Sequence, residues 1–288
     1  MKNALSILFA FMVTISFAQT NGIAYKIYDQ KGKELSFEKF IKNTSKNEVL
    51  LFGEYHNNSI IHWLQLQTLK ALKTQEQNLV IGSEMFETDN QLLIDEYFLG
   101  MVKQSNFEKE MKLWNNYSTD YKPILEFAYE TNSKFVATNI PRRYASIVSS
   151  KGLDYLDSLS EEAKSYIAPL PIKFGLEIPG YQEMLKMMGM HGDESKSINF
   201  VSAQASKDAT MAHFIEKNLK PNSIFVHFNG DFHSKEFGGI YWYLKRNNVD
   251  LKVETIAVVE SENFEFEKDY EKLGNYIILI PTDMTKTY

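Results

Sequence analysis

The chain has 288 residues, of which 44% are hydrophobic and 24% are charged, as is ordinary for a globular protein that buries a sizeable core. Its formal net charge of -6 provides no basic footprint, so we expect no nucleic-acid partner. The absence of cysteine excludes disulfides, thiolate metal sites and a lipidated N-terminal cysteine.

Residues 1–18 have the pattern of a signal peptide: a positive Lys2, an apolar run, and small residues at Ser16 and Ala18 before the expected cut. The apolar run is too short to span a bilayer comfortably, and an uncleaved N-terminal anchor is the alternative. We therefore expect an exported protein, periplasmic or associated with the outer membrane without being a lipoprotein. Residues 19–288 would then form one domain.

After the leader, apolar runs of strand length are bounded by polar residues. They lie at 24–30, 48–53, 78–84, 133–139, 223–229, 253–259 and 275–281. Between the first two, Ser36 is positioned to cap a short helix.

The runs from 48 to 229 are separated mostly by long segments with helical periodicity, as in a mainly parallel sheet covered on both faces. The last two runs favour an antiparallel edge. Helical insertions at about 88–130 and 150–203 predict an added helical cap. The fold class is therefore α/β, with helices flanking the sheet.

Two strand ends carry the same pattern of glycine, acid, aromatic residue and histidine. The first is GEYH at residues 53–56 and the second is GDFH at residues 230–233. In an open parallel sheet, ligands bind at the carboxyl ends of the strands. Because alternate residues of an extended segment share a face, Glu54 is expected to point with His56, and Asp231 with His233.

A third strand run ends in Glu84, and Arg142 follows the fourth. Imidazole nitrogen and carboxylate oxygen suit zinc, manganese or iron. We therefore expect one or two divalent transition metals on a set of four ligands: Glu54, His56, Glu84 and His233. In that hypothesis the catalytic residues are Glu54 or Asp231 as general base and Arg142 as the group that steadies an anion. The bland interpretation is that these residues form structural ion pairs or cap helices.

Three further residues have two possible roles each, and a fourth has one. His62 would face the site from a helix start or pack in the core. Gln204 and Asp208 are one turn apart at the start of a predicted helix, and would reach the site; alternatively, Asp208 serves the helix dipole. His227 lies inside a strand run and is predicted to be a hydrogen-bonded core histidine.

Six segments in order resemble the haem-binding uptake, ChaN-like family, related to the Tiki and TraB group and to erythromycin esterases. They are LLFGEYHNNSIIHWLQLQTLKAL, GSEMFETDNQ, WNNYSTDYKPILEFA, VATNIPRRYASIVSSKG, AQASKDATMAHFIEKNL and FVHFNGDFHSKEFGGIYWYLKRN, which span about residues 45–248. By this resemblance Gly53–His56 and Gly230–His233 are the two motifs, and Glu84 is the strand-end glutamate.

The resemblance implies an exported or membrane-attached protein that binds haem in iron uptake, alongside the haem-uptake machinery of the outer membrane. It also implies haem held through a tyrosine at the interface of a homodimer, and no motif identifies that tyrosine here. The alternative function is a metal-dependent hydrolase of a peptide, ester or amide, which rests on the carboxylate and imidazole residues themselves.

Overall fold

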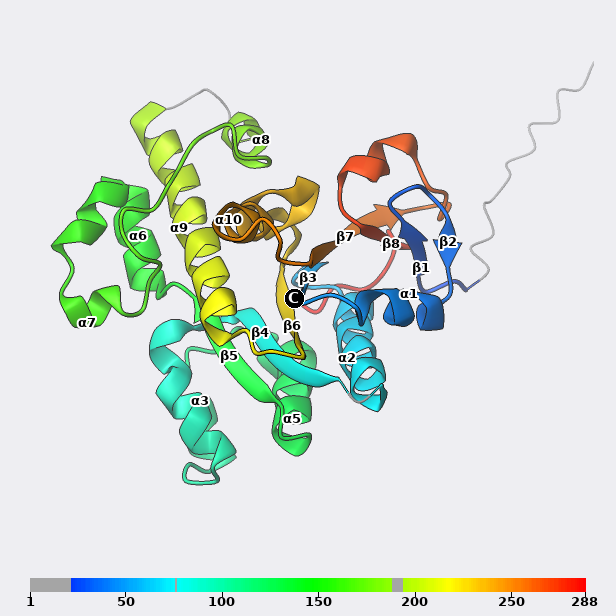
Figure 1. The fold of residues 1–288 in the computed structure, drawn as a ribbon, viewed down its shortest axis with the longest axis horizontal. Helices are drawn as coiled ribbons and strands as arrows, with labels where there is room; N and C mark the ends of the chain where they lie inside the picture. Colours follow the sequence, from blue (N-terminus) through cyan, green and yellow to red (C-terminus); the bar gives the residue numbers. More distant parts are fainter. Residues whose placement is uncertain (1–21, 76, 188–193) are drawn as a thin grey trace, which may run out of the picture.

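The computed structural model describes residues 22–75, 77–187 and 194–288, so the predicted signal peptide at residues 1–18 lies outside the described residues (Figure 1). The strands of the described part are β1 (Lys26–Asp29), β2 (Glu34–Leu35), β3 (Val49–Glu54), β4 (Asn78–Glu87), β5 (Lys134–Asn139), β6 (Ser223–Gly230), β7 (Val253–Ser261) and β8 (Tyr276–Pro281). They form one sheet in the order β2-β1-β8-β7-β3-β6-β4-β5. Each strand run expected from the sequence is a strand, with β4 extending further than the run predicted.

The prediction of an antiparallel edge at β7 and β8 is wrong. β7 pairs in parallel with β3 on one side and with β8 on the other. The connection between β7 and β8 is long enough to carry the chain back to the starting end, as a parallel crossover requires. The antiparallel edge is formed instead by β1, which pairs with β8 and with the short β2.

The α-helices are α1 (Phe37–Thr44), α2 (Ser59–Thr74), α3 (Gln91–Phe98), α4 (Gln104–Glu110), α5 (Lys122–Glu130), α6 (Arg142–Lys151), α7 (Glu161–Lys164), α8 (Tyr181–Met187), α9 (Glu194–Asn218) and α10 (Gly239–Asn247). Single turns are η1 (Thr88–Asn90), η2 (Tyr117–Tyr121), η3 (Leu153–Ser158), η4 (Asp231–His233), η5 (Lys235–Phe237) and η6 (Lys268–Lys272), of which η2 is a π-helix and the others are 3-10 helices. Within the described residues, no helix is both long and apolar enough to cross a membrane.

The central strand β3 is covered on both faces, which explains its continuous apolar sequence. Leu50 and Phe52 pack in a cluster with residues of α1, α2 and α5 on one face. Val49 and Leu51 pack with α9 and α10 on the other. Figure 1 shows the two helix layers on opposite sides of the sheet. Each such side chain, fully buried, contributes about 1.5–3 kcal/mol of transfer free energy, so the sheet is a rigid base for the loops at its edge.

Helix caps determine where the chain leaves the strands. Ser36 caps α1, as predicted, by accepting a hydrogen bond from the backbone N–H of Lys39 at 3.2 Å. Asn58 caps α2 by accepting from the N–H groups of Ile60 and Ile61, at 3.1 and 3.2 Å. The Asn58 cap turns the chain from β3 into α2 within four residues, 55–58, and so holds the GEYH motif close to the sheet.

Candidate functional site

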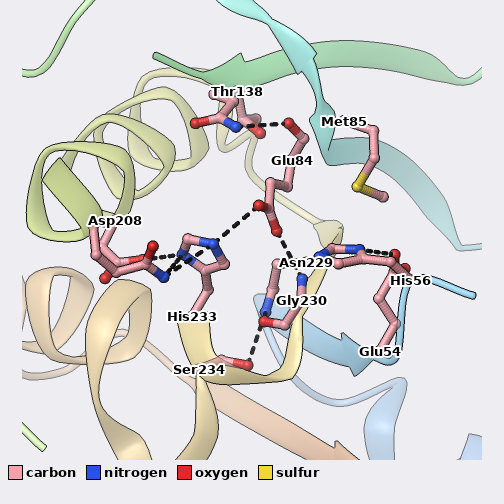
Figure 2. A network of polar contacts seen from close by, with 12 residues as sticks. Glu54, His56, Glu84, Met85, Thr138, Asp208, Asn229, Gly230, His233 and Ser234 are labelled. Atoms are coloured by element: carbon pink, nitrogen blue, oxygen red, sulfur yellow. Dashed lines mark hydrogen bonds and ion pairs between the residues drawn. The ribbon is translucent and has the colours of Figure 1, made fainter. Parts of the chain in front are cut away.

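Three neighbouring strands, β3, β6 and β4, bring the predicted acids and imidazoles to one edge of the sheet. Glu54, the last residue of β3, pairs in register with Gly230, the last residue of β6. Glu84 lies on β4, on the other side of β6. Figure 2 shows Glu84 between His233 on one side and His56 on the other. The four residues predicted as a ligand set therefore do lie together.

Glu54 and His56 form the first pair, in which the carboxylate is buried and the imidazole is partly exposed. The Glu54 carboxylate, 1% exposed, lies 2.9 Å from Nδ1 of His56 and accepts hydrogen bonds from Gln65 Nε2 at 2.7 Å and Tyr121 Oη at 2.9 Å. Burial raises the pKa of Glu54, but the charge of His62 and the bond from His56 outweigh burial and lower that pKa. The carboxylate is thus ionised and orients the His56 ring.

The His56 ring is the more accessible imidazole of the cluster. Its side chain is 29% exposed, and Trp114 packs beside it with ring centroids 4.9 Å apart. Burial lowers the pKa of His56, whereas the hydrogen bond to Glu54 and the charge of Glu84 raise it above its usual value overall. Because Nδ1 faces Glu54, Nε2 faces the opposite side, toward Gly230 and Glu84.

His233 forms a second, tighter group with two carboxylates. Its Nε2 lies 3.0 Å from Glu84 Oε1, and its Nδ1 contacts Asp208 Oδ1. Burial disfavours the charged ring, but the carboxylates of Glu84 and Asp208 raise the pKa of His233 to about 9. Burial raises the pKa of Glu84, but the charge of His233 holds it well below its usual range. At neutral pH, His233 is therefore an imidazolium.

Asp208 and Gln204 on α9 both lie beside His233. Asp208 accepts a hydrogen bond from Tyr181 Oη at 2.6 Å in addition to its contact with His233. The amide of Gln204 lies 2.9 Å from Nδ1 and 3.1 Å from Nε2 of His233. Burial raises the pKa of Asp208. One face of α9 thus closes the cluster opposite the strand ends.

Gly230 lies between the two groups. Its backbone N–H donates to Glu84 Oε2 at 2.7 Å. A Cβ at position 230 would lie 2.7 Å from Nε2 of His56, so any larger residue would displace that ring. Close approach of the backbone to a polar group is the reason for glycine at this position.

Asp231 does not point with His233, contrary to the prediction. The segment Asp231–His233 is the 3-10 turn η4, so the alternation of an extended strand does not apply. The buried carboxylate accepts instead from the backbone N–H of Val258 on β7, at 3.1 Å. Burial raises the pKa of Asp231 to about 6. Asp231 joins the motif to β7 and contacts none of the imidazoles.

Arg142 does not lie where its expected catalytic role requires, and His62 packs below the cluster. The guanidinium of Arg142 is paired with Glu87 and donates to the carbonyl of Lys112 at 3.2 Å, so it does not balance Glu54 or Glu84. His62 is 4% exposed and lies 3.1 Å from the His56 carbonyl oxygen and 3.2 Å from Gln65. His62 packs beneath the first pair and supports it. His227 is, as predicted, a core histidine, 2.8 Å from Thr138 Oγ1.

The predicted metal set is not supported by this arrangement. Across the described ranges, no group of three or more histidine, aspartate or glutamate side chains is placed to hold a metal ion. Both ring nitrogens of His233 face carboxylates, and Nδ1 of His56 faces Glu54. The imidazole nitrogens that would bind a metal are instead paired with carboxylates of the protein.

Two cavities open above the cluster and share one wall. The first, of about 570 Å³, runs past Glu87, Arg142 and Phe200. The second, of about 480 Å³, contains His56 and His233. The residues common to both are Glu84, Trp114, Gln204, Lys207 and Tyr288. We call the two together the groove.

Sequence reasoning missed several residues of the groove and its floor: Gln65, Trp114, Tyr121, Lys207 and Tyr288. Gln65 has a weak signal, since it lies three residues after His62 on the same helix face. Trp114 and Tyr121 belong to the segment around the π-helix η2, whose path no periodicity indicates. Tyr288 comes from a distant part of the chain.

One family model matches most of the chain. A family described as haem-binding uptake, Tiki superfamily, ChaN matches residues 40–244. The solved structure titled "Cofacial heme binding to ChaN of Campylobacter jejuni" is similar over 90% of this chain and 98% of that chain, with a TM-score of 0.67 and 18% identity.

A Bacillus cereus protein is similar over 84% of this chain and 90% of that chain, with a TM-score of 0.51 and 11% identity. An erythromycin esterase, EreC, covers 83% of this chain and 77% of its own, with a TM-score of 0.48 and 11% identity. No curated protein sequence matches the chain. At these identities the structural likenesses show the shared fold alone.

Proposed function

Because the chain belongs to the haem-binding uptake family ChaN of the Tiki superfamily, we propose that it binds haem in the groove above the strand ends. Membership of this family supports a haem-binding role related to uptake. The position of the ligand, the export of the protein and its uptake partners are the further parts of the proposal.

The groove suits haem in size and in the chemistry of its walls. Cavities of about 570 and 480 Å³ that share a wall are within the range of cofactor sites. Aromatic and apolar side chains that suit a porphyrin face include Met85, Trp114, Ile140, Phe200, Phe232 and Tyr288. Lys207 lines both cavities as a cation, and the guanidinium of Arg142, although paired with Glu87, is 57% exposed at the same groove; both suit the propionates of haem. This combination of aromatic walls and cations is the observation that carries the proposal.

The donor set also fits an iron porphyrin. Side chains of His56 and Tyr55 line the second cavity, and imidazole and tyrosine oxygen are both known axial ligands of haem iron. When bound, haem supplies an iron centre that takes such a ligand. The protein's own part is to hold the macrocycle against the aromatic wall and to neutralise its propionates.

A hemin titration with a matched tryptophan control tests this function and its position. The unsubstituted protein is expected to shift the Soret band of hemin and to saturate near one hemin per chain. Trp114→Ala is expected to weaken hemin binding about tenfold, as loss of a central aromatic contact does. Trp63, 50% exposed on α2 and not part of the groove, provides the control Trp63→Ala.

An absorption spectrum identical to that of free hemin at every protein concentration would contradict haem binding. Equal losses of affinity in Trp114→Ala and Trp63→Ala would contradict the groove as its place. The charge-reversed variant Lys207→Glu adds a second test, because repulsion of a propionate is expected to reduce affinity more at low salt than at high salt.

Export and assembly are part of the same proposal. The pattern at residues 1–18 supports export, and cleavage would give a protein that begins near residue 19. Intact mass of the protein recovered from the periplasmic fraction tests this, and retention of residues 1–18 in a cytoplasmic fraction would contradict it. We propose a homodimer, since a second copy would cover haem left exposed in an open groove. Light scattering with and without hemin measures the change in oligomeric state.

A second candidate function is hydrolysis of a peptide, ester or amide by the imidazoles themselves. The favouring observation is that Glu54 holds Nδ1 of His56, while the charged His233 lies across Glu84 at the floor of the same groove. His56 would remove a proton from water as the water oxygen attacks the carbonyl carbon and forms a tetrahedral adduct. The adduct would then break its bond to the leaving alcohol or amine, which takes the proton from the His56 imidazolium. Because the pKa of His56 is raised, the fraction of neutral imidazole, which is the form that acts as a base, increases at a pH above the usual histidine pKa.

Turnover of simple esters and amides in the presence of a chelator tests this second function. Glu54→Gln is expected to reduce the rate by about a hundredfold or more, as loss of a group that orients the base does. The surface variant Glu108→Gln, which alters a carboxylate paired with Lys122, is the control. Equal rates in Glu54→Gln and Glu108→Gln would remove this candidate.

A further inference from the structure

The segment 286–288 is attached to the loop that carries the first motif. Lys286 forms a β-bridge with Asn58, and the N–H of Thr287 donates to the carbonyl of Asn57 at 3.0 Å. The hydroxyl of Thr287 donates to Asp120 Oδ2 at 2.8 Å. These contacts hold the segment against residues 55–58, directly beside His56.

A second set of contacts anchors Lys286 itself. Its ammonium is paired with Glu260 on β7 and lies 5.9 Å from the centroid of the Tyr55 ring. Asp120, which receives the Thr287 hydroxyl, is buried and accepts from Asn116 Nδ2 at 2.6 Å. The segment is therefore held from β7 on one side and from η2 on the other.

This anchoring places Tyr288 at the junction of the two cavities. Among tyrosines of the described residues, Tyr288 alone lines both cavities, and it shares this position with Trp114. Its side chain is 60% exposed, so most of the ring is available to a ligand. The segment lies outside residues 40–244, so the family match does not extend to it.

We propose that Tyr288 is a ligand-contacting residue of the groove, whose ring covers haem bound there and is held in place by the 286–288 segment. This inference rests on the proposed haem function. A tyrosine ring offers a large, rigid surface for a flat aromatic ligand at the cost of ordering only two side-chain torsions.

The surroundings of Tyr288 favour contact through the ring over ligation through an anionic oxygen. Partial burial and the charges of Glu54 and Asp120 raise the pKa of the Tyr288 phenol, so it stays neutral at physiological pH. A neutral ring packs on a porphyrin face whether or not it bears a hydroxyl. A phenylalanine at position 288 is therefore expected to contact haem as well as the tyrosine does.

Hemin titrations of Tyr288→Ala and Tyr288→Phe test the inference. Tyr288→Ala is expected to weaken hemin affinity about tenfold, and Tyr288→Phe to stay within about twofold of the unsubstituted protein. The matched control is Tyr129→Ala, which removes a tyrosine of similar exposure, 44%, on α5 and lines neither cavity. Thermal unfolding of each variant confirms that the fold is retained.

The outcomes separate the inference from the function on which it rests. If the unsubstituted protein binds no hemin, the proposed haem-binding function itself is wrong. If it binds hemin and Tyr288→Ala binds as tightly as Tyr129→Ala, the inference about Tyr288 is wrong. A loss in Tyr288→Phe as large as that in Tyr288→Ala would show that the oxygen is the contact and would overturn packing through the ring.

Discussion

The carboxylate of Glu84 lies 3.0 Å from Nε2 of His233, and both side chains are buried, with 4% of Glu84 and 6% of His233 exposed. Two segments that are far apart in the chain thus meet as a charged pair at the end of the sheet. Asp208 holds the other ring nitrogen, so the imidazolium is enclosed between two acids.

Glu84→Gln is expected to destabilise the protein by about 3–5 kcal/mol, because it removes the charge of one partner of a buried pair. Glutamine keeps the size of the side chain, so packing is conserved. Urea unfolding at pH 7 measures the change. The control is Glu161→Gln, whose exposed carboxylate is paired with Lys164 and is expected to contribute less than about 1 kcal/mol. Equal effects of the two substitutions would mean that the buried pair adds no net stability.

The stability of the protein is expected to fall at alkaline pH through His233. The folded pKa of about 9 lies above the unfolded value of about 6.5, which corresponds to about 3 kcal/mol. This contribution is fully present below about pH 6.5 and is lost as the pH rises through about 9. Unfolding of the unsubstituted protein and of His233→Asn from pH 6 to pH 10 measures it, and parallel curves for the two proteins would contradict the assignment.

Asp231→Asn is expected to stabilise the protein at neutral pH. The folded pKa of about 6 against an unfolded value of about 3.9 means that ionisation of Asp231 costs the folded state about 3 kcal/mol above pH 6. Asparagine keeps an oxygen acceptor for the Val258 N–H and carries no charge. The gain in stability should be present at pH 7.5 and absent at pH 4, where Asp231 of the folded protein is protonated. A loss of stability at both pH values would refute this account.

Gly230→Ala is expected to destabilise the fold by about 1–3 kcal/mol, because the added methyl group meets Nε2 of His56 at 2.7 Å. A double-mutant cycle identifies the cause. In a His56→Ala background the obstructing ring is gone, so Gly230→Ala should cost less than about 1 kcal/mol. If the cost is the same in both backgrounds, the restriction at position 230 comes from the backbone and not from the imidazole.

The ends of the strands could be predicted from the sequence with little error, because the necessary signals are local. Apolar runs bounded by polar residues marked β3, β4 and β6, and parallel strands share their carboxyl edge, so Glu54, Glu84 and His233 were expected together. The antiparallel edge was misplaced, because strand pairing depends on contacts between segments that are far apart. Asp231 was assigned the wrong face, because the chain leaves β6 in a 3-10 turn and not in an extended segment.

Long-range contacts decide which charged side chains pair with one another. Local patterns in the chain were enough to predict an α/β sheet, the edge that carries the acids and imidazoles, and the family. They could not pair His233 with Asp208, direct Arg142 to Glu87, or bring Tyr288 to the groove. Local periodicity decides which face of an element is apolar, but a buried charge takes whichever opposite charge the folded chain brings within a few ångströms.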